Sequence, residues 1–328
     1  MRMFSFLDGL LEIDADEIMK RTSPLPSDTV LISGTLVEGI GNKHSDIDVY
    51  VITDELPDEA RLGKHQFTGY HQGRIRQYYD YIGTDGFGFD VEYYTWAEVQ
   101  EMISQVGELY RKARGHTKIL RQKLKYGDDD ALHKFRVGEC LTGKDRYKAT
   151  FDTQTWKQLC FTQYRNKTGG FPEFKDMMGA WGSGDYDTSL FVCRAYLADQ
   201  AAGLYHLTGI SNTKPKWIAQ NLKRLPVELH ELAEDILQWF FEGTGDHTAR
   251  KEAVLKACDL LDRIYAAEQR LLASDPTFYS PEEALLLTEE EFQRELYHDP
   301  QTLIEFEHRR LLFSGADKTL RQFMKQYS

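Results

Sequence analysis

Residues 31–51 have the sequence LISGTLVEGIGNKHSDIDVYV, and this stretch decides the fold class. The apolar run from Val30 to Ile32 predicts a buried strand, and a turn at Gly34-Thr35 follows it. A second apolar segment then carries Asp46 and Asp48, which are separated by one residue. Because side chains two positions apart on a strand point to the same face, both carboxylates are aimed at one small volume. Such charges repel each other unless a cation lies between them, so the stretch predicts a metal site.

The alternative is that this Asp-x-Asp lies on an exposed strand and is simply solvated. Ile47, Val49 and Val51 interleave the acids, which gives the strand a buried face and holds the carboxylates at its margin. There, desolvation demands a partner for each charge. Carboxylate oxygens that bind a hard cation, beside a glycine turn that phosphates can approach closely, are typical of sites for phosphoryl or nucleotidyl transfer. The pattern therefore favours chemistry over packing.

Gly34-Thr35, followed eleven residues later by Asp46-Ile-Asp48, resembles the glycine-serine and paired-aspartate signature of the DNA polymerase beta-like nucleotidyltransferases. The resemblance is strongest to the minimal, antibiotic-modifying branch of that superfamily. The family most often has serine after the motif glycine, whereas this chain has Thr35. Ser33 precedes the glycine, so a hydroxyl is present on either side of it.

The family also has a third carboxylate on a later strand. The segment Gly88-Phe-Asp-Val-Glu92 offers Asp90 and Glu92 on one strand face. We favour Asp90 because a hydrophobic-acid-hydrophobic step after a glycine turn resembles the third-acid strand of the family, and Glu92 remains the alternative. The resemblance implies that two Mg²⁺ ions are bound by the aspartates of the motif, and that the triphosphate is held by the residues around the glycine. The implied metal ligands are Asp46, Asp48 and Asp90, with Glu92 as a further catalytic candidate, and the implied nucleotide contacts are Ser33, Gly34, Thr35 and Ser45.

A basic segment lies further along the chain, at Lys214-Pro-Lys216-Trp217. The free backbone donors and the dipole at a helix start attract anions. The segment is similar to the lysine-tryptophan step in the helical domain of several enzymes of this family. We therefore expect Lys216 to contact nucleotide phosphates; the alternative is a solvated turn anchored by Trp217.

The chain has 328 residues, of which 41% are hydrophobic and 28% charged, and this suits two domains. No apolar run is long enough for a membrane span, and the acid-interrupted amino terminus predicts a helix, not a signal peptide, so a cytoplasmic location is expected. The cysteines stand far apart, which argues against a zinc ribbon or a redox pair. They are Cys140, Cys160, Cys193 and Cys258.

The net charge is −12 and no basic stripe is present, so nothing indicates nucleic-acid binding. An acidic surface attracts cations, which suits a cationic small-molecule acceptor, although solubility alone would also account for it. The oligomeric state is left open by the sequence.

Hydrophobic periodicity predicts an α/β + α organisation, with an α/β domain at 1–130 and an all-helical domain at 131–328. The resemblance implies that the first of these is a small mixed-sheet nucleotidyltransferase domain. In the first domain we expect an opening helix to residue 20, strands at 30–32, 46–52, 75–82 and 87–94, and a loop at 58–73 over the active site. Thr95 and Glu98 have the spacing of a capping box before a helix. Helices are expected at 130–142, 153–165, 187–208, 214–223, 227–241, 247–273, 281–296 and 300–313.

The expected function is Mg²⁺-dependent transfer of a nucleoside monophosphate, with ATP or another nucleoside triphosphate as donor, to a hydroxyl of a small acceptor such as an aminoglycoside-like compound. Pyrophosphate is released. The alternatives are transfer to a protein or tRNA, synthesis of a nucleotide second messenger, and a catalytically silent nucleotide-binding regulator.

Overall fold

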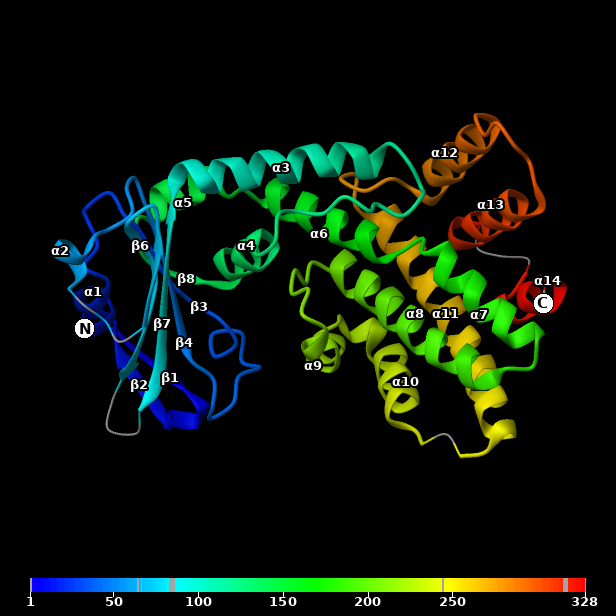
Figure 1. The fold of residues 1–328 in the computed structure, drawn as a ribbon, viewed down its shortest axis with the longest axis horizontal. Coiled ribbons are helices and arrows are strands. Elements are labelled where there is room, and N and C mark those ends of the chain that lie inside the picture. Colours follow the sequence, from blue (N-terminus) through cyan, green and yellow to red (C-terminus); the bar gives the residue numbers. More distant parts are fainter. Residues whose placement is uncertain are drawn as a thin grey trace. The chain divides into compact units, whose positions relative to one another are not determined.

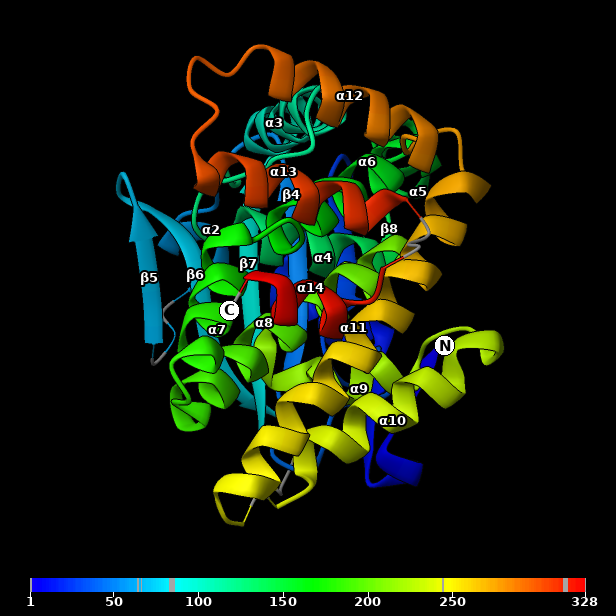
Figure 2. The same ribbon diagram turned by 90° about the vertical axis from the view of Figure 1, so that its right-hand side faces the viewer.

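The computed structural model describes residues 2–63, 65, 67–82, 86–243, 245–314 and 318–327. The chain divides into two compact units, which can be followed by colour in Figures 1 and 2. The first unit holds Met1–Gln105 and Leu124–Trp156, and the second holds Val106–Lys123 and Lys157–Ser328. Residues 131–156 therefore pack with the first unit, whereas the expected boundary at residue 130 assigned them to the helical part.

Among the described residues, the first unit is built on a mixed sheet of six strands in the order β5-β6-β7-β4-β3-β8. β4 and β7 are parallel, and the other neighbours are antiparallel. A separate antiparallel pair, β1 (Met3–Phe6) and β2 (Leu11–Asp14), precedes the sheet. The sheet strands are β3 (Thr29–Ser33), β4 (Ile47–Thr53), β5 (Phe67–His71), β6 (Arg74–Ile82), β7 (Phe87–Thr95) and β8 (Glu139–Thr142). The expected fold class, a mixed-sheet domain followed by helices, is confirmed.

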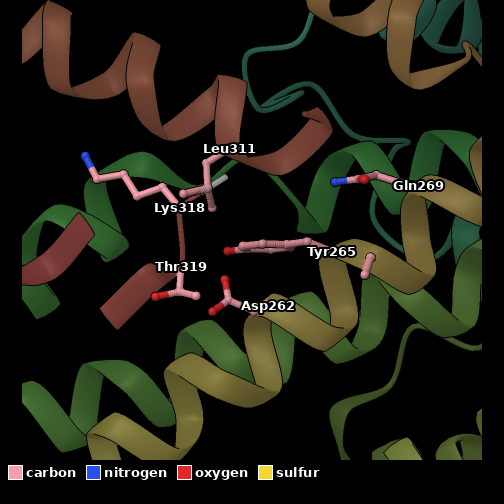
Figure 3. Close-up of a pocket in the computed structure, with 7 residues that line it drawn as sticks. Asp262, Tyr265, Gln269, Leu311, Lys318 and Thr319 are labelled. Carbon is pink, nitrogen blue, oxygen red and sulfur yellow. The ribbon is translucent and has the colours of Figure 1, made fainter. Parts of the chain in front are cut away.

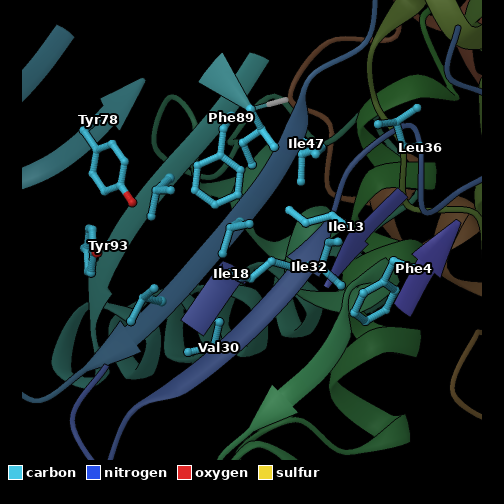
Figure 4. Packing of buried hydrophobic residues seen from close by; sticks show 14 of the residues in the cluster. Phe4, Ile13, Ile18, Val30, Ile32, Leu36, Ile47, Tyr78, Phe89 and Tyr93 are labelled. Carbon is cyan, nitrogen blue, oxygen red and sulfur yellow. The ribbon is translucent and has the colours of Figure 1, made fainter. Parts of the chain in front are cut away.

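One face of this sheet is an apolar core (Figure 4). Alternation along the strands puts Ile47 and Val49 of β4 and Phe89 of β7 on this face, where they are at most 1% exposed. They pack with Ile13 of β2 and Ile18 of α1 (Ala15–Thr22). Because successive strand residues point to opposite faces, burying this apolar set forces Asp48 and Asp90 onto the other face.

The other face is covered in part by α4 (Asp128–Val137). Phe135 on α4 packs edge-on against Tyr50 of β4 and Tyr94 of β7, with ring centroids 5.7 and 5.2 Å apart. The Tyr147 hydroxyl, on α5 (Lys144–Thr150), donates to the Phe135 carbonyl at 2.8 Å. These aromatic contacts hold α4 over the middle of β4 and β7, beside the positions that carry the acids.

The second unit is helical, and α11 packs against α8, which in turn packs against α7. Figure 2 shows α12 and α13 next to each other in orange and red. The helices from α6 on are α6 (Thr153–Lys167), α7 (Phe171–Gly182), α8 (Tyr186–Leu207), α9 (Ile218–Lys223), α10 (His230–Phe241), α11 (His247–Ser274), α12 (Pro281–Gln293), α13 (Pro300–Phe313) and α14 (Leu320–Tyr327). None of the described helices has the length and apolar character to cross a membrane. α3 (Trp96–Arg114) begins in the first unit and ends in the second.

The predicted opening helix is wrong for residues 3–14, which form the β1–β2 hairpin. Its turn places Leu7, Asp8 and Gly9 at positive φ, a conformation that a helix cannot contain. Phe4, Leu11 and Ile13 are buried while Met3, Ser5 and Glu12 are exposed, so the period here is two. Only the segment from Ala15 onward is helical.

Two further predictions are wrong in part. The expected loop at 58–73 contains α2 (Glu59–Leu62) and β5; residues 64 and 66 lie outside the described residues. Gln72 and Gly73, both at positive φ, form the tight turn that folds β5 back onto β6. The expected helix at 130–142 ends at Val137, because residues 139–142 pair with β3 as β8. Helices α5, α7 and α14 were not expected.

Candidate active site

The acids of the motif converge because β4 and β7 are parallel and in register. Asp48 is paired directly with Asp90, and Asp46 lies just before β4, two residues from Asp48. Ser33, the last residue of β3, lies opposite Asp48 on the other side. The sheet therefore assembles three carboxylates, from segments about forty residues apart, beside the end of β3.

Gly34 touches this cluster so closely that no other residue fits there. Its φ is +88°, and a Cβ added to it would lie 1.7 Å from Asp48 Oδ2. Beyond it, the Thr35 carbonyl accepts the backbone N–H groups of Ile40 and Gly41 at 3.0 and 2.8 Å, which folds residues 34–41 into a compact loop. The glycine thus brings a bare backbone against the carboxylate of Asp48.

The predicted hydroxyl residues have partners within the protein. Ser33 is 1% exposed, and its hydroxyl donates to the Lys134 carbonyl at 2.5 Å. Ser45 Oγ accepts the backbone N–H of Asn42 at 2.9 Å, which closes the turn before Asp46. Both residues lie at the candidate site. The bonds that they make hold the loop and α4 in place.

Each carboxylate receives a donor from a side chain that the sequence analysis did not assign to the site. The Lys134 ammonium lies 3.2 Å from Asp48 Oδ2. The Tyr79 hydroxyl donates to Asp46 Oδ1 at 3.2 Å, and the Gln77 amide to Asp90 at 3.0 and 3.2 Å. Lys134 lies on α4, and Tyr79 and Gln77 lie on β6, which is next to β7 in the sheet.

Glu92 has a different environment from Asp90. It is paired with Tyr50 and accepts hydrogen bonds from the hydroxyls of Tyr50 and Tyr94 at 3.2 and 2.9 Å. It lies one step further from the motif than Asp90, against the aromatic contact with α4. The register thus favours Asp90 as the partner of Asp48, and Glu92 as a neighbouring negative charge.

The acids of the site are buried and repel one another, so a nearby positive charge stabilises their ionised forms. Burial is the largest cause that raises the pKa of Asp48; the Lys134 ammonium opposes it, and Glu92 and Asp46 add to it. The pKa of Asp90 is raised to about 6, again chiefly by burial, while the Gln77 hydrogen bond lowers it. Burial and the nearby Asp46 raise the pKa of Tyr79 to about 12, so its hydroxyl remains a donor.

The residues fit a hard divalent cation by type and by backbone position. Asp46, Asp48 and Asp90 supply only oxygen ligands, which Mg²⁺ prefers. Within the described residues, however, no three acid, histidine or cysteine side chains are already arranged around a common point. The lysine, tyrosine and glutamine donors satisfy the carboxylates, so a cation would bind by replacing some of these bonds.

Lys216 belongs to the second unit and lies in a short 3-10 turn, Pro215–Trp217. It is exposed, and its ammonium is 5.2 Å from the Trp217 ring centroid. Both readings of this segment, a phosphate contact and a solvated turn anchored by Trp217, agree with that position. Its role in nucleotide binding stays a prediction.

The second unit has a hollow of its own, of about 200 Å³, among α11, α13 and α14 (Figure 3). Asp262 points into it, and both of its carboxylate oxygens accept the backbone N–H of Leu320 at 3.1 Å. Burial raises the pKa of Asp262 to about 6. Asp262 thus binds the backbone at the start of α14, and this structural role accounts for an acid in the hollow.

Comparisons with known proteins give little beyond this geometry. No family model and no curated protein matches the chain. Among solved structures, the chain is similar to a nucleotidyltransferase-like protein from Exiguobacterium sibiricum, at 10% identity over 80% of this chain and 79% of that chain, with a TM-score of 0.37. This likeness is too loose to assign the chain to a family.

Proposed function

We propose that this protein is a nucleotidyltransferase that moves a nucleoside monophosphate from a nucleoside triphosphate to a hydroxyl of a small molecule. The observation that carries the proposal is the pairing of Asp48 with Asp90 on parallel strands, with Asp46 beside them and Gly34 in direct contact. Three converging acids repel one another and raise one another's pKa values, and such clusters are concentrated at functional sites.

Two Mg²⁺ ions are the proposed cofactors, held by Asp46, Asp48 and Asp90. When bound, they neutralise the triphosphate and stabilise the charge that develops during in-line displacement. The chain's own residues position the reactants. The Gly34-Thr35 turn receives the triphosphate, since a residue without a side chain lets phosphate oxygens approach closely. Asp90, with Glu92 nearby, accepts the proton of the attacking hydroxyl.

The strand order suggests where the acceptor binds. The Gly34 turn follows β3, on one side of the acids, whereas β6 and β5 lie on the other side, beyond Asp90. Three aromatic side chains lie on this side and on the same face as the acids. Tyr79 packs edge-on against Phe67 of β5 and against Tyr81, with centroids 6.3 and 5.3 Å apart.

Phe67 and Tyr81 are 55% and 49% exposed, so this aromatic strip is accessible. Exposed rings beside carboxylates suit an acceptor with a positive charge, because aromatic rings attract cations through their faces. The net charge of −12 supports the same choice. ATP is the donor that we propose first, and Lys216 stays a proposed contact to its phosphates.

The test is turnover with a defined set of substrates. ATP, GTP, CTP or UTP is incubated with Mg²⁺ and an aminoglycoside panel, tRNA, or no acceptor. Pyrophosphate release and product mass are then measured. We expect a small-molecule product whose mass has increased by one nucleoside monophosphate. A labelled tRNA or protein product would show that the acceptor is a macromolecule. A product formed from nucleotides alone would show that the acceptor is itself a nucleotide. Either result would refute the proposed small-molecule acceptor.

The acids are tested by substitution. Asp46→Asn and Asp48→Asn remove a metal ligand at nearly constant shape, and each should reduce turnover by at least about a hundredfold. Asp145→Asn is the matched control, since Asp145 is an exposed acid of α5 in the same unit. Full turnover in the Asp46 and Asp48 variants would exclude the proposed mechanism. Lys216→Ala should weaken nucleotide binding, and an unchanged affinity would remove Lys216 from the site.

A further inference from the structure

The ammonium of Lys134 is a positive charge in direct contact with the acid cluster, 3.2 Å from Asp48 Oδ2. Its side chain is 9% exposed and that of Asp48 is 20% exposed, so the pair is largely withdrawn from water. A lysine is rarely buried without an acidic partner, and a carboxylate surrounded by other acids equally needs a cation. Lys134 therefore supplies within the chain the charge that a metal ion would supply.

The same oxygen of Asp48 faces both the lysine and the glycine turn. Asp48 Oδ2 is 3.2 Å from Lys134 Nζ, and it is also the atom that a Cβ on Gly34 would strike. The ammonium thus lies beside the backbone proposed to receive the triphosphate. An ammonium at this point could bind either the carboxylate or a phosphate oxygen without a long movement.

The backbone under Lys134 is fixed, so only the side chain is free to change partner. The Lys134 carbonyl accepts the Ser33 hydroxyl at 2.5 Å, at the end of β3. The preceding residue, His133, lies 2.9 Å from Glu38 of the glycine loop, and this pair is 4% and 2% exposed. These bonds attach α4 to the loop, while the four-carbon stem of lysine keeps its own rotamers.

We propose that Lys134 is a built-in counter-ion that occupies Asp48 in the metal-free protein and moves to the triphosphate when nucleotide binds. A divalent ion and the ammonium would then compete for Asp48, so that metal binds weakly without nucleotide and tightly with it. This inference rests on the proposed function. It adds that metal loading is coupled to the nucleotide through one side chain.

The test measures Mn²⁺ binding directly, from the paramagnetic resonance signal of the free ion, with no turnover. Lys134→Met keeps the length of the stem and removes the charge. Without nucleotide, we expect this variant to bind Mn²⁺ about tenfold more tightly than the unmodified protein, within the usual range of coupling between sites. Lys148→Met is the matched control, because it removes one exposed positive charge from α5 of the same unit.

The nucleotide side of the coupling is measured with a nonhydrolysable ATP analogue. In the unmodified protein and in Lys148→Met, the analogue should tighten Mn²⁺ binding strongly. In Lys134→Met the analogue should tighten Mn²⁺ binding less, because the ammonium that competes with the metal for Asp48 is absent. Thermal unfolding with and without Mg²⁺ provides a second measurement: Mg²⁺ should stabilise Lys134→Met more than the unmodified protein, and adding Asp48→Asn should abolish the difference.

The outcomes separate this inference from the proposed function. Equal Mn²⁺ affinities in Lys134→Met and the unmodified protein, with normal tightening by the analogue, would overturn the counter-ion role alone. If no variant bound Mn²⁺ under any condition, the metal-dependent function would fail together with it. If Lys134→Met unfolded and Mg²⁺ did not restore it, the lysine would be a structural partner only and the inference would be wrong.

Discussion

Replacing Gly34 by alanine tests the contact between the glycine turn and Asp48. The substitution has two separate costs. A non-glycine residue in the left-handed region costs about 1–2 kcal/mol, and Gly34 has a φ of +88°. In addition, the new Cβ would lie 1.7 Å from Asp48 Oδ2, so the carboxylate must rotate away from Lys134. Leaving a buried polar group without its partner costs about 1–3 kcal/mol.

Gly39→Ala is the matched control for this experiment. Gly39 lies in the same loop at a φ of +72°, but an added Cβ there meets no atom within 4 Å. Gly39→Ala should therefore lose only about 1–2 kcal/mol of unfolding free energy, from the backbone conformation alone. Gly34→Ala should lose about 2–5 kcal/mol of unfolding free energy. Urea denaturation measures both.

Turnover should separate the two variants further. Gly34→Ala displaces a proposed metal ligand and obstructs the proposed phosphate turn, so pyrophosphate release should fall by at least about a hundredfold. Gly39→Ala should keep most of its activity once its lower stability is allowed for. If both variants had the same stability and the same turnover, the close approach of Gly34 to Asp48 would have no role in the site.

Other parts of the molecule give further predictions. Phe67→Ala and Tyr81→Ala should raise the KM for the acceptor several-fold and leave the KM for nucleotide unchanged. Tyr126→Ala, at an exposed tyrosine of the first unit, is the control and should change neither KM. Equal effects in all three variants would exclude the aromatic strip as the acceptor site. Burial lowers the pKa of His308 to about 3, so the unfolded chain takes up its proton first. Stability should fall as pH drops from about 6.5 towards 3, by up to about 1.4 kcal/mol per pH unit from this group, and urea titrations of His308→Gln should lack that slope. Ser280→Ala removes the capping box of α12 and should cost about 1 kcal/mol in thermal unfolding; no change would mean that the cap is redundant.

Local patterns predicted several elements correctly, because the forces involved act between neighbours in sequence. The strands that carry Asp48 and Asp90 were predicted from apolar alternation, and both are present. The capping box of Thr95 and Glu98 was predicted from residue type and spacing. Glu98 accepts the backbone N–H of Thr95 at 2.7 Å, and the Thr95 hydroxyl accepts the backbone N–H of Glu98 at 3.2 Å.

Other elements depend on contacts that no local pattern encodes. Residues 139–142 continue a helical pattern but form β8, because the edge of β3 offers backbone partners. The amino-terminal hairpin likewise forms where apolar residues alternate against the core, around a turn that a helix cannot contain. In both places the tertiary environment overrides a weak local preference.

The sequence by itself determined that two carboxylates share one face beside a glycine, since strand geometry fixes the direction of residues two apart. Only the tertiary structure decided which later acid joins them, because the register of β4 with β7 pairs Asp48 with Asp90 and not with Glu92. It also decided the partners of the acids. Lys134, Tyr79 and Gln77 reach them from α4 and β6, elements whose positions are set by packing over the whole first unit and not by any spacing along the chain.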